Sequence, residues 1–256
     1  MTPIQFSHAN GMPAPSYRVL LEALGERPIG YVERFGHGQF KVGYTWASLV
    51  DELIADIESR WKEPVIGIGH SLGGVLSMQA AARRPELFRQ LILLDPPMFA
   101  PHRRWAMGTV WALGFGGKMI PPAVKAKRRK RTFASLEAAR TYWLQRPFFQ
   151  RFDPRCFEDY LHAGLEPAPE GVKLRFTAEN EYRIFLGTPA FLPKAPRNLP
   201  VDFIIASSHD TLQSQDVAAL RRRYPQAGFH VIEGTHMFPM EQPDAAAKAI
   251  LNLIKS

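Results

Sequence analysis

Three residues stand in an order along the chain that suits nucleophilic catalysis: Ser71, then Asp210, then His236. A serine hydroxyl is a poor nucleophile at neutral pH, so it needs a neighbouring base that is itself held by an acid. We therefore predict acyl transfer with Ser71 as nucleophile, His236 as base and Asp210 as acid. Asp95 is the alternative acid, because it also follows a strand candidate.

Apolar segments precede all four of these residues and read as strands of a parallel sheet. The segments are 65–69 before Ser71, 91–94 before Asp95, 201–206 before Asp210 and 228–233 before His236. Ligands of open α/β sheets bind at the carboxyl ends of the strands, which is where these residues would lie. The pattern therefore predicts one shared site at that edge of the sheet.

Helical patterns alternate with the strands at 16–24, 46–61, 72–84, 216–224 and 243–254. Such alternation predicts right-handed βαβ units and a doubly wound, mostly parallel α/β sheet. It fails between residues 101 and 198, a segment that contains 15 of the 29 aromatic residues. We expect residues 1–100 and 199–256 to form the core domain and 101–198 to form an inserted helical cap.

The segment Gly69-His70-Ser71-Leu72-Gly73-Gly74 lies between a buried strand and a helix, which is the setting of a nucleophile elbow. Glycines two residues either side of Ser71 leave room for its sharp turn. Two backbone N–H groups are expected to bind the oxyanion. We predict the N–H of Leu72, at the helix start, and that of Asn10, in the loop after the first strand.

These segments resemble the α/β-hydrolase superfamily, in particular serine esterase or lipase-like members with an inserted cap. Residues 69–74 look like the elbow, and 8–11 (His-Ala-Asn-Gly) are similar to the oxyanion loop. Residues 34–38 and 234–243 resemble its Arg-Gly-His-Gly loop and its histidine segment. Because only about five residues precede the oxyanion loop, the usual edge strands should be absent. That leaves about six strands, and a homodimer could cover the bare edge.

The resemblance implies hydrolysis of carboxylic esters or related acyl substrates without a cofactor or a metal. Serine at the elbow argues against dehalogenases and epoxide hydrolases, which use aspartate there. Cofactor-free lyases, C–C hydrolases and perhydrolases share the triad and remain alternatives. A further alternative is a non-catalytic protein that holds a hydrophobic ligand on a hydrolase scaffold.

His8, His70, Trp105 and Trp111 are the candidates for lining the substrate site. His8 is better suited to bracing its own loop than to proton transfer. The aromatic side chains of the cap favour an apolar or aromatic acyl ester as the small-molecule substrate. The alternative is that these aromatic residues form the cap's own small core.

Net charge is +8, and much of the excess lies in the basic run Lys125–Arg131. Such a run can attract nucleic acid or anionic lipid, or it can be a solvated face. No nucleic-acid-binding motif accompanies it, which argues against a nucleic-acid partner.

The sequence contains no apolar stretch of transmembrane length, its N-terminus lacks the features of a signal peptide, and Cys156 is the single cysteine. We therefore expect a cytoplasmic protein.

Overall fold

A six-stranded sheet with the order β2-β1-β3-β4-β8-β9 forms the centre of the fold, and every neighbouring pair is parallel. The computed structural model describes residues 1–256 except 114, 116–117, 119–120, 190–191, 195–197 and 255–256. The strands are β1 (Ile4–Ser7), β2 (Ile29–Tyr31), β3 (Val65–His70), β4 (Phe88–Leu94), β8 (Val201–Ala206) and β9 (Gly228–Ile232). The doubly wound parallel sheet of about six strands is confirmed.

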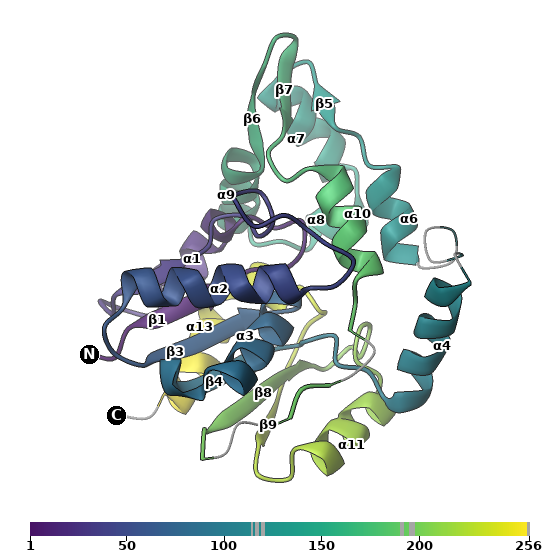
Figure 1. Cartoon of the computed structure of the whole chain (residues 1–256). Helices are drawn as coiled ribbons and strands as arrows, with labels where there is room; N and C mark the ends of the chain where they lie inside the picture. The colour runs from purple at the N-terminus through teal and green to yellow at the C-terminus, as the bar shows by residue number, and fades with distance from the viewer. Residues whose placement is uncertain (114, 116–117, 119–120, 190–191, 195–197, 255–256) are drawn as a thin grey trace.

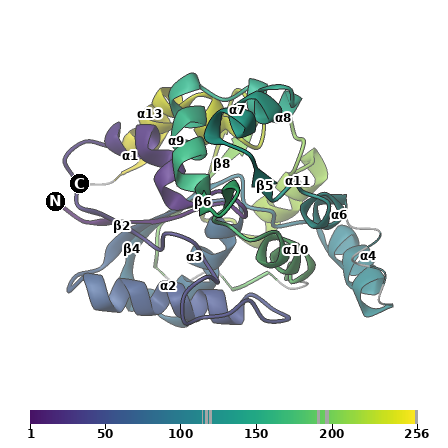
Figure 2. The same ribbon diagram turned by 90° about the horizontal axis from the view of Figure 1, so that it is seen from above.

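Helices cover both faces of this sheet, as Figures 1 and 2 show. One face carries α1 (Arg18–Glu22), preceded by a 3₁₀ turn η1 (Ala14–Tyr17), and α13 (Pro243–Leu253). The other face carries α2 (Ala47–Arg60), α3 (Leu72–Arg83) and α11 (Ser214–Arg223). The short segments η2 (Pro85–Leu87) and α12 (Phe238–Glu241) precede β4 and α13. Alternate strand residues point to opposite faces, so each face has its own apolar core.

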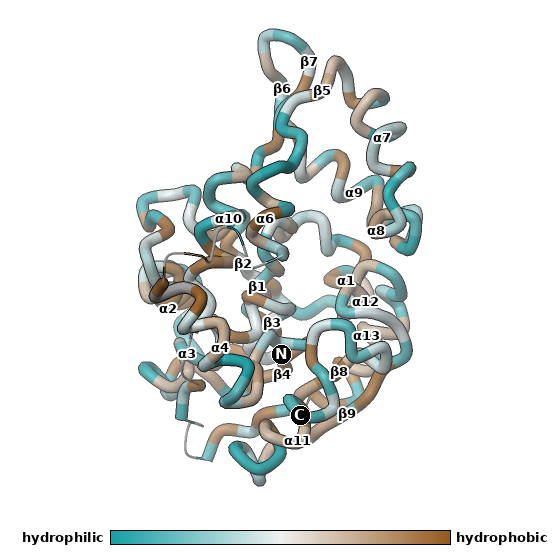
Figure 3. The backbone as a smooth tube through the Cα atoms, turned by 90° about the vertical axis from the view of Figure 1, so that its right-hand side faces the viewer, coloured by the Kyte–Doolittle hydropathy of each residue, from teal (hydrophilic) through white to brown (hydrophobic). Residues whose placement is uncertain are grey.

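Between β4 and β8 the chain forms a long segment of helices and short strands, which we call the insertion and which lies above and to the right of the sheet in Figure 1; its role as a separate cap domain stays a prediction. Its helices are α4 (Pro101–Ala112), α6 (Pro121–Lys127), α7 (Leu136–Leu144), α8 (Pro147–Gln150), α9 (Pro154–Gly164) and α10 (Ala178–Leu186). It also contains a small antiparallel sheet that the sequence did not predict, formed by β5 (Thr132–Phe133), β6 (Leu165–Ala168) and β7 (Gly171–Leu174). The turn of the β6–β7 hairpin is hydrophilic (Figure 3).

Aromatic residues of the insertion pack mainly on one another. Trp143 stacks on Phe149 with ring centroids 5.4 Å apart, and both rings lie against Tyr160. Trp143 is 2% exposed and Tyr160 is 1% exposed. These rings belong, with Phe133, Phe152 and Phe157, to a hydrophobic cluster that is continuous with one face of the central sheet, so their role is core packing rather than pocket lining.

Some element boundaries differ from the sequence prediction. The helix predicted over 16–24 begins as the 3₁₀ turn η1 and continues as α1 only to Glu22. Among the described residues, no helix is long and apolar enough to cross a membrane.

Candidate active site

Ser71 stands at the sharp turn between β3 and α3. Its backbone has φ 54° and ψ −118°, a conformation that L-residues rarely adopt. The Ser71 N–H donates to Leu94 O at 2.9 Å, which extends the β3–β4 ladder by one bond and fixes the turn against β4. Such a strained backbone conformation persists only where the surrounding structure holds it in place, and it is common at functional sites.

Glycines around Ser71 are required by close backbone approach. A Cβ on Gly73 would overlap the Ser7 carbonyl at the end of β1, and one on Gly69 would overlap the Gly73 backbone. The tight packing of β1, β3 and α3 therefore needs glycine at both positions. This accounts for the Gly-x-Ser-x-Gly spacing in steric terms.

The His236 ring connects Ser71 to an acid. Its Nε2 lies 2.9 Å from Ser71 Oγ, and its Nδ1 lies 2.7 Å from Asp95 Oδ2. Because the Asp95 oxygen accepts, Nδ1 must carry a proton. In the neutral ring Nε2 is then the acceptor for the Ser71 hydroxyl. The three side chains thus form the hydrogen-bonded order that activates a serine.

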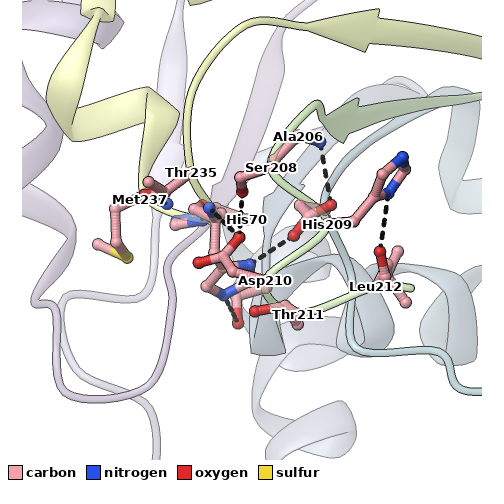
Figure 4. Close-up of polar contacts among 12 residues, drawn as sticks. His70, Ala206, Ser208, His209, Asp210, Thr211, Leu212, Thr235 and Met237 are labelled. Atoms are coloured by element: carbon pink, nitrogen blue, oxygen red, sulfur yellow. Dashed lines mark hydrogen bonds and ion pairs between the residues drawn. The ribbon is translucent and has the colours of Figure 1, made fainter. Parts of the chain in front are cut away.

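Asp210 does not occupy the position that we predicted for it. Its Oδ1 accepts the backbone N–H of His236 at 2.9 Å and the Ser208 hydroxyl at 2.6 Å. Figure 4 shows Asp210 and Ser208 beside the Thr235–Met237 segment, while the His209 ring turns away toward Leu212. Asp210 therefore supports the histidine loop, and the expected contact with the ring is replaced by the one from Asp95.

Asp95 reaches the ring because β4 ends beside β3 and β8. Its N–H donates to Ile204 O at 2.8 Å, and its φ of 44° turns the chain immediately afterwards. Oδ1 accepts the Ala206 N–H at 3.1 Å, which leaves Oδ2 for His236. The side chain is 1% exposed, so both oxygens are held away from solvent.

The two backbone N–H groups expected to bind an oxyanion lie at the start of α3 and in the loop after β1. Leu72 is the first residue of α3, so its N–H has no acceptor within the helix. Asn10 follows β1, next to β3 in the sheet, and its Nδ2 donates to Glu181 O of α10 at 2.9 Å. Donation by the Leu72 and Asn10 N–H groups to an oxyanion stays a prediction.

Residues of the insertion hold the loop after β1, which we expect to supply an oxyanion donor and call the oxyanion loop. Arg129 forms an ion pair with Glu181 at 2.7 Å and donates to the Tyr160 hydroxyl. A Cβ on Gly11 would lie 3.1 Å from the Glu181 carboxyl carbon, so the loop passes directly under this pair. These contacts could not be predicted from the sequence, because Gly11, Arg129, Tyr160 and Glu181 are far apart along the chain.

His8 braces the loop and is fully buried, so its assignment to substrate binding was wrong. Nδ1–H donates to Ala9 O at 2.8 Å, and Nε2 accepts the Phe35 N–H at 3.0 Å. Burial lowers the pKa of His8 to about 4. A neutral ring with both nitrogens occupied joins the loops after β1 and β2.

His70 was also assigned to substrate binding, and it is likewise fully buried. Its Nδ1 lies 2.7 Å from the Tyr17 hydroxyl and its Nε2 lies 2.9 Å from His236 O. A carbonyl only accepts, so Nε2 carries the proton and Nδ1 accepts from Tyr17, whose oxygen accepts the Ala9 N–H at 3.3 Å. Burial and the neighbouring His236 ring hold the pKa of His70 well below its usual range. The chain of bonds connects the oxyanion loop to the His236 loop.

The tryptophan candidates give no support to a pocket lining. Trp105 on α4 is 73% exposed, and the side chain of Trp111 lies outside the described residues. A cavity of about 660 Å³ is lined by residues of α2, α3, α4 and the end of α10, but not by Ser71, Asp95 or His236. Within the described part of the chain, no group of three or more His, Cys, Asp or Glu residues could hold a metal ion.

The geometry of a strained serine, a bridging histidine and a buried aspartate at one sheet edge agrees with the sequence comparison. The model of the alpha/beta hydrolase family matches residues 6–249. The chain belongs to this family.

Curated relatives of this hydrolase include Lipase LipV of Mycobacterium tuberculosis, which is 37% identical over 238 residues, 90% of this chain and 85% of the relative. Type I acyl-CoA thioesterase mpaH of Penicillium roqueforti is 26% identical over 215 residues, 72% of this chain. The match spans about half of that relative's length, 47%.

Solved structures share the fold over almost the whole chain. E-2-(acetamidomethylene)succinate hydrolase aligns with a TM-score of 0.83 at 20% identity and covers 100% of this chain and 92% of its own. A thioesterase domain from the curacin biosynthetic pathway aligns with a TM-score of 0.74 at 17% identity, over 98% and 91% of the two chains. The names of the relatives support hydrolase activity.

Proposed function

We propose that the chain is a serine hydrolase that cleaves carboxylic esters or thioesters through an acyl-enzyme. The observation that carries the proposal is the bond series from Ser71 Oγ to His236 Nε2 and from His236 Nδ1 to Asp95 Oδ2. The similarity to proteins named lipase and acyl-CoA thioesterase favours acyl substrates. Asp95 takes the acid role that we first gave to Asp210.

In the proposed reaction Ser71 Oγ attacks the acyl carbon while its proton passes to His236 Nε2. Asp95 holds Nδ1–H and stabilises the positive charge on the ring. The Leu72 and Asn10 N–H groups bind the oxyanion. Collapse breaks the bond to the leaving group, which takes the proton from Nε2. Water then attacks the acyl-serine while its proton passes to His236 Nε2; collapse breaks the bond to Ser71 Oγ, which takes the proton back from Nε2, and the acid is released.

A graded panel of p-nitrophenyl esters, from acetate to laurate, tests the reaction with purified protein. We expect turnover that Ser71→Ala lowers by at least about 10⁴-fold, because the variant has no nucleophile. The dependence on acyl length measures what the site accepts. Matching acyl-CoA thioesters, with release of the thiol as readout, separate esterase from thioesterase activity.

Ser207→Ala is a suitable control, because Ser207 lies at the same edge of the sheet without touching His236. Its hydroxyl oxygen accepts the Gly234 N–H at 3.3 Å. If Ser71→Ala keeps the activity of the unmodified protein on every ester and thioester, the proposal fails. Turnover by Ser207→Ala within a few-fold of the unmodified protein would show that the loss is specific to Ser71.

A further inference from the structure

The positive charge of the chain is concentrated in one segment. Residues 96–136 contain no Asp or Glu, whereas the whole chain has a net charge of +8. The basic residues in this segment are Arg103, Arg104, Lys118, Lys125, Lys127, Arg128, Arg129, Lys130 and Arg131. The rest of the chain therefore has a net charge close to zero, and this segment is the strongest candidate for attracting an anionic partner.

Several of these cations have internal contacts, and two of them form ion pairs. Arg103 forms an ion pair with the buried Asp216 of α11, and Arg129 forms one with Glu181. The others at and after the end of α4 are exposed: Lys118, Lys125, Lys127, Arg128, Lys130 and Arg131. No ion pair within the described parts of the chain involves these six. Lys127 lies over the Tyr182 ring and Lys130 over the Phe133 and Tyr142 rings, but both remain exposed, so all six charges can still attract an external anion.

Large apolar side chains are exposed in the same segment. Trp105 is 73% exposed, Leu113 is 65% exposed and Phe115 is 47% exposed. They follow one another along α4 and just past its end. Exposed apolar side chains that are gathered with cations, rather than scattered singly, indicate an interaction surface. Tryptophan beside lysine is typical of segments that lie at the boundary of a bilayer.

The fold places this surface where a flat partner can reach it. In Figures 1 and 2, α4 stands at the outer edge of the molecule and α6 is the next element inward. No helix of the described chain could span a bilayer, so contact with a membrane would be at its surface.

We propose that this basic–aromatic surface, made of Trp105, Leu113, Phe115 and the six exposed cations, docks the protein on an anionic lipid bilayer. The cations face the lipid phosphates, and the apolar side chains enter the region between headgroups and acyl chains. Nucleic acid would satisfy the cations but would leave the apolar side chains exposed, so lipid fits the surface better. The docking does not depend on the proposed hydrolysis.

Co-sedimentation with vesicles tests the docking. The probes are phosphatidylcholine vesicles and vesicles of equal parts phosphatidylcholine and phosphatidylglycerol. We expect binding only to the anionic vesicles, and its loss at about 1 M salt, where the Debye length falls to about 3 Å. Each lysine near an anionic surface contributes roughly fivefold in affinity. Lys118→Gln/Lys125→Gln/Lys127→Gln should therefore weaken binding about a hundredfold.

Lys41→Gln/Lys62→Gln/Lys248→Gln is the matched control, because it removes the same charge from exposed lysines on other parts of the surface. It should keep vesicle affinity within a few-fold. Trp105→Ala should weaken binding roughly tenfold at unchanged net charge, since the tryptophan is the largest apolar side chain of the surface. Circular dichroism confirms that each variant is folded.

Equal loss of binding in the two lysine triples would overturn the proposal, because net charge alone would then explain it. Absence of binding to anionic vesicles would also overturn it. So would tight, salt-dependent binding to a DNA duplex that depends on the first lysine triple but not on Trp105. Ser71→Ala protein should bind vesicles like the unmodified protein, which separates failure of docking from failure of the proposed catalysis.

Discussion

Replacement of Asp95 and of Asp210 by asparagine distinguishes the two candidate acids. Asp95 uses one oxygen for the Ala206 N–H at 3.1 Å and the other for His236 Nδ1 at 2.7 Å. Asparagine has a single carbonyl oxygen for these two donors. If it stays on Ala206, its NH₂ faces Nδ1, which must then accept. The ring proton moves to Nε2, and Nε2 can no longer accept the proton of Ser71.

If the amide turns instead, its NH₂ opposes the Ala206 N–H in a place that is 1% exposed, which costs about 1–3 kcal/mol. Either arrangement is unproductive, so we expect Asp95→Asn to lower kcat by about 10³- to 10⁴-fold, or about 4–5 kcal/mol. Asp210→Asn keeps an oxygen for the His236 N–H and Ser208, and should cost less than about tenfold.

The assay is steady-state hydrolysis of a short p-nitrophenyl ester, with thermal unfolding to confirm that both variants are folded. A loss of about 10³-fold in Asp210→Asn together with near-full activity in Asp95→Asn would refute the reasoning. It would mean that the resting geometry changes when substrate binds.

Three further predictions concern groups around the triad. Tyr17→Phe removes the hydroxyl that links the Ala9 N–H to His70 Nδ1. We expect kcat to fall about tenfold and the free energy of unfolding to fall by about 1–3 kcal/mol. An unchanged kcat would contradict a role of Tyr17 in positioning the His236 loop. The pKa of His8 is lowered to about 4, below its value of about 6.5 in the unfolded chain. The stability that the neutral ring contributes is therefore fully present above pH 6.5 and is lost as the pH falls toward 4, by about 1.4 kcal/mol per pH unit. His8→Asn should remove this part of the pH dependence, as measured by urea titrations at several pH values. Burial raises the pKa of Glu52 to about 7, so ionisation of this carboxyl lowers the free energy of unfolding as the pH rises from about 4.5 to 7. Glu52→Gln should therefore raise the free energy of unfolding by on the order of 1 kcal/mol at pH 8 and leave it unchanged at pH 4, as measured by urea titrations.

Most of the sheet was predictable because its strands are buried on both faces and read as apolar runs. Val201–Ala206 was predicted with the boundaries that the structure has. The small sheet β5–β7 was missed because its strands are only two to four residues long, and because β5 pairs with a strand about forty residues further along the chain. The β6–β7 hairpin is local, but its strands are too short for a clear alternating pattern.

Ser71 and His236 could be located from their positions at strand ends, and the structure brings them within hydrogen-bond distance. The choice of acid was wrong because Asp95 and Asp210 both follow strands next to the site. What separates them is the turn at Asp95, with φ 44°, and this is a backbone property that the sequence does not show. The hydrogen bond between Tyr17 and His70 could not be predicted for a similar reason, since Tyr17 lies in the helix predicted over 16–24, far from His70 in the sequence.

The central claim is that Ser71 is a nucleophile activated by His236, and covalent labelling tests it most directly. Purified protein is treated with a fluorophosphonate, digested, and mapped by mass spectrometry. We predict one adduct per chain, on Ser71, with labelling abolished in Ser71→Ala and slowed by at least about 10³-fold in His236→Ala. Labelling that persists in Ser71→Ala, or an adduct on another residue, would contradict the account.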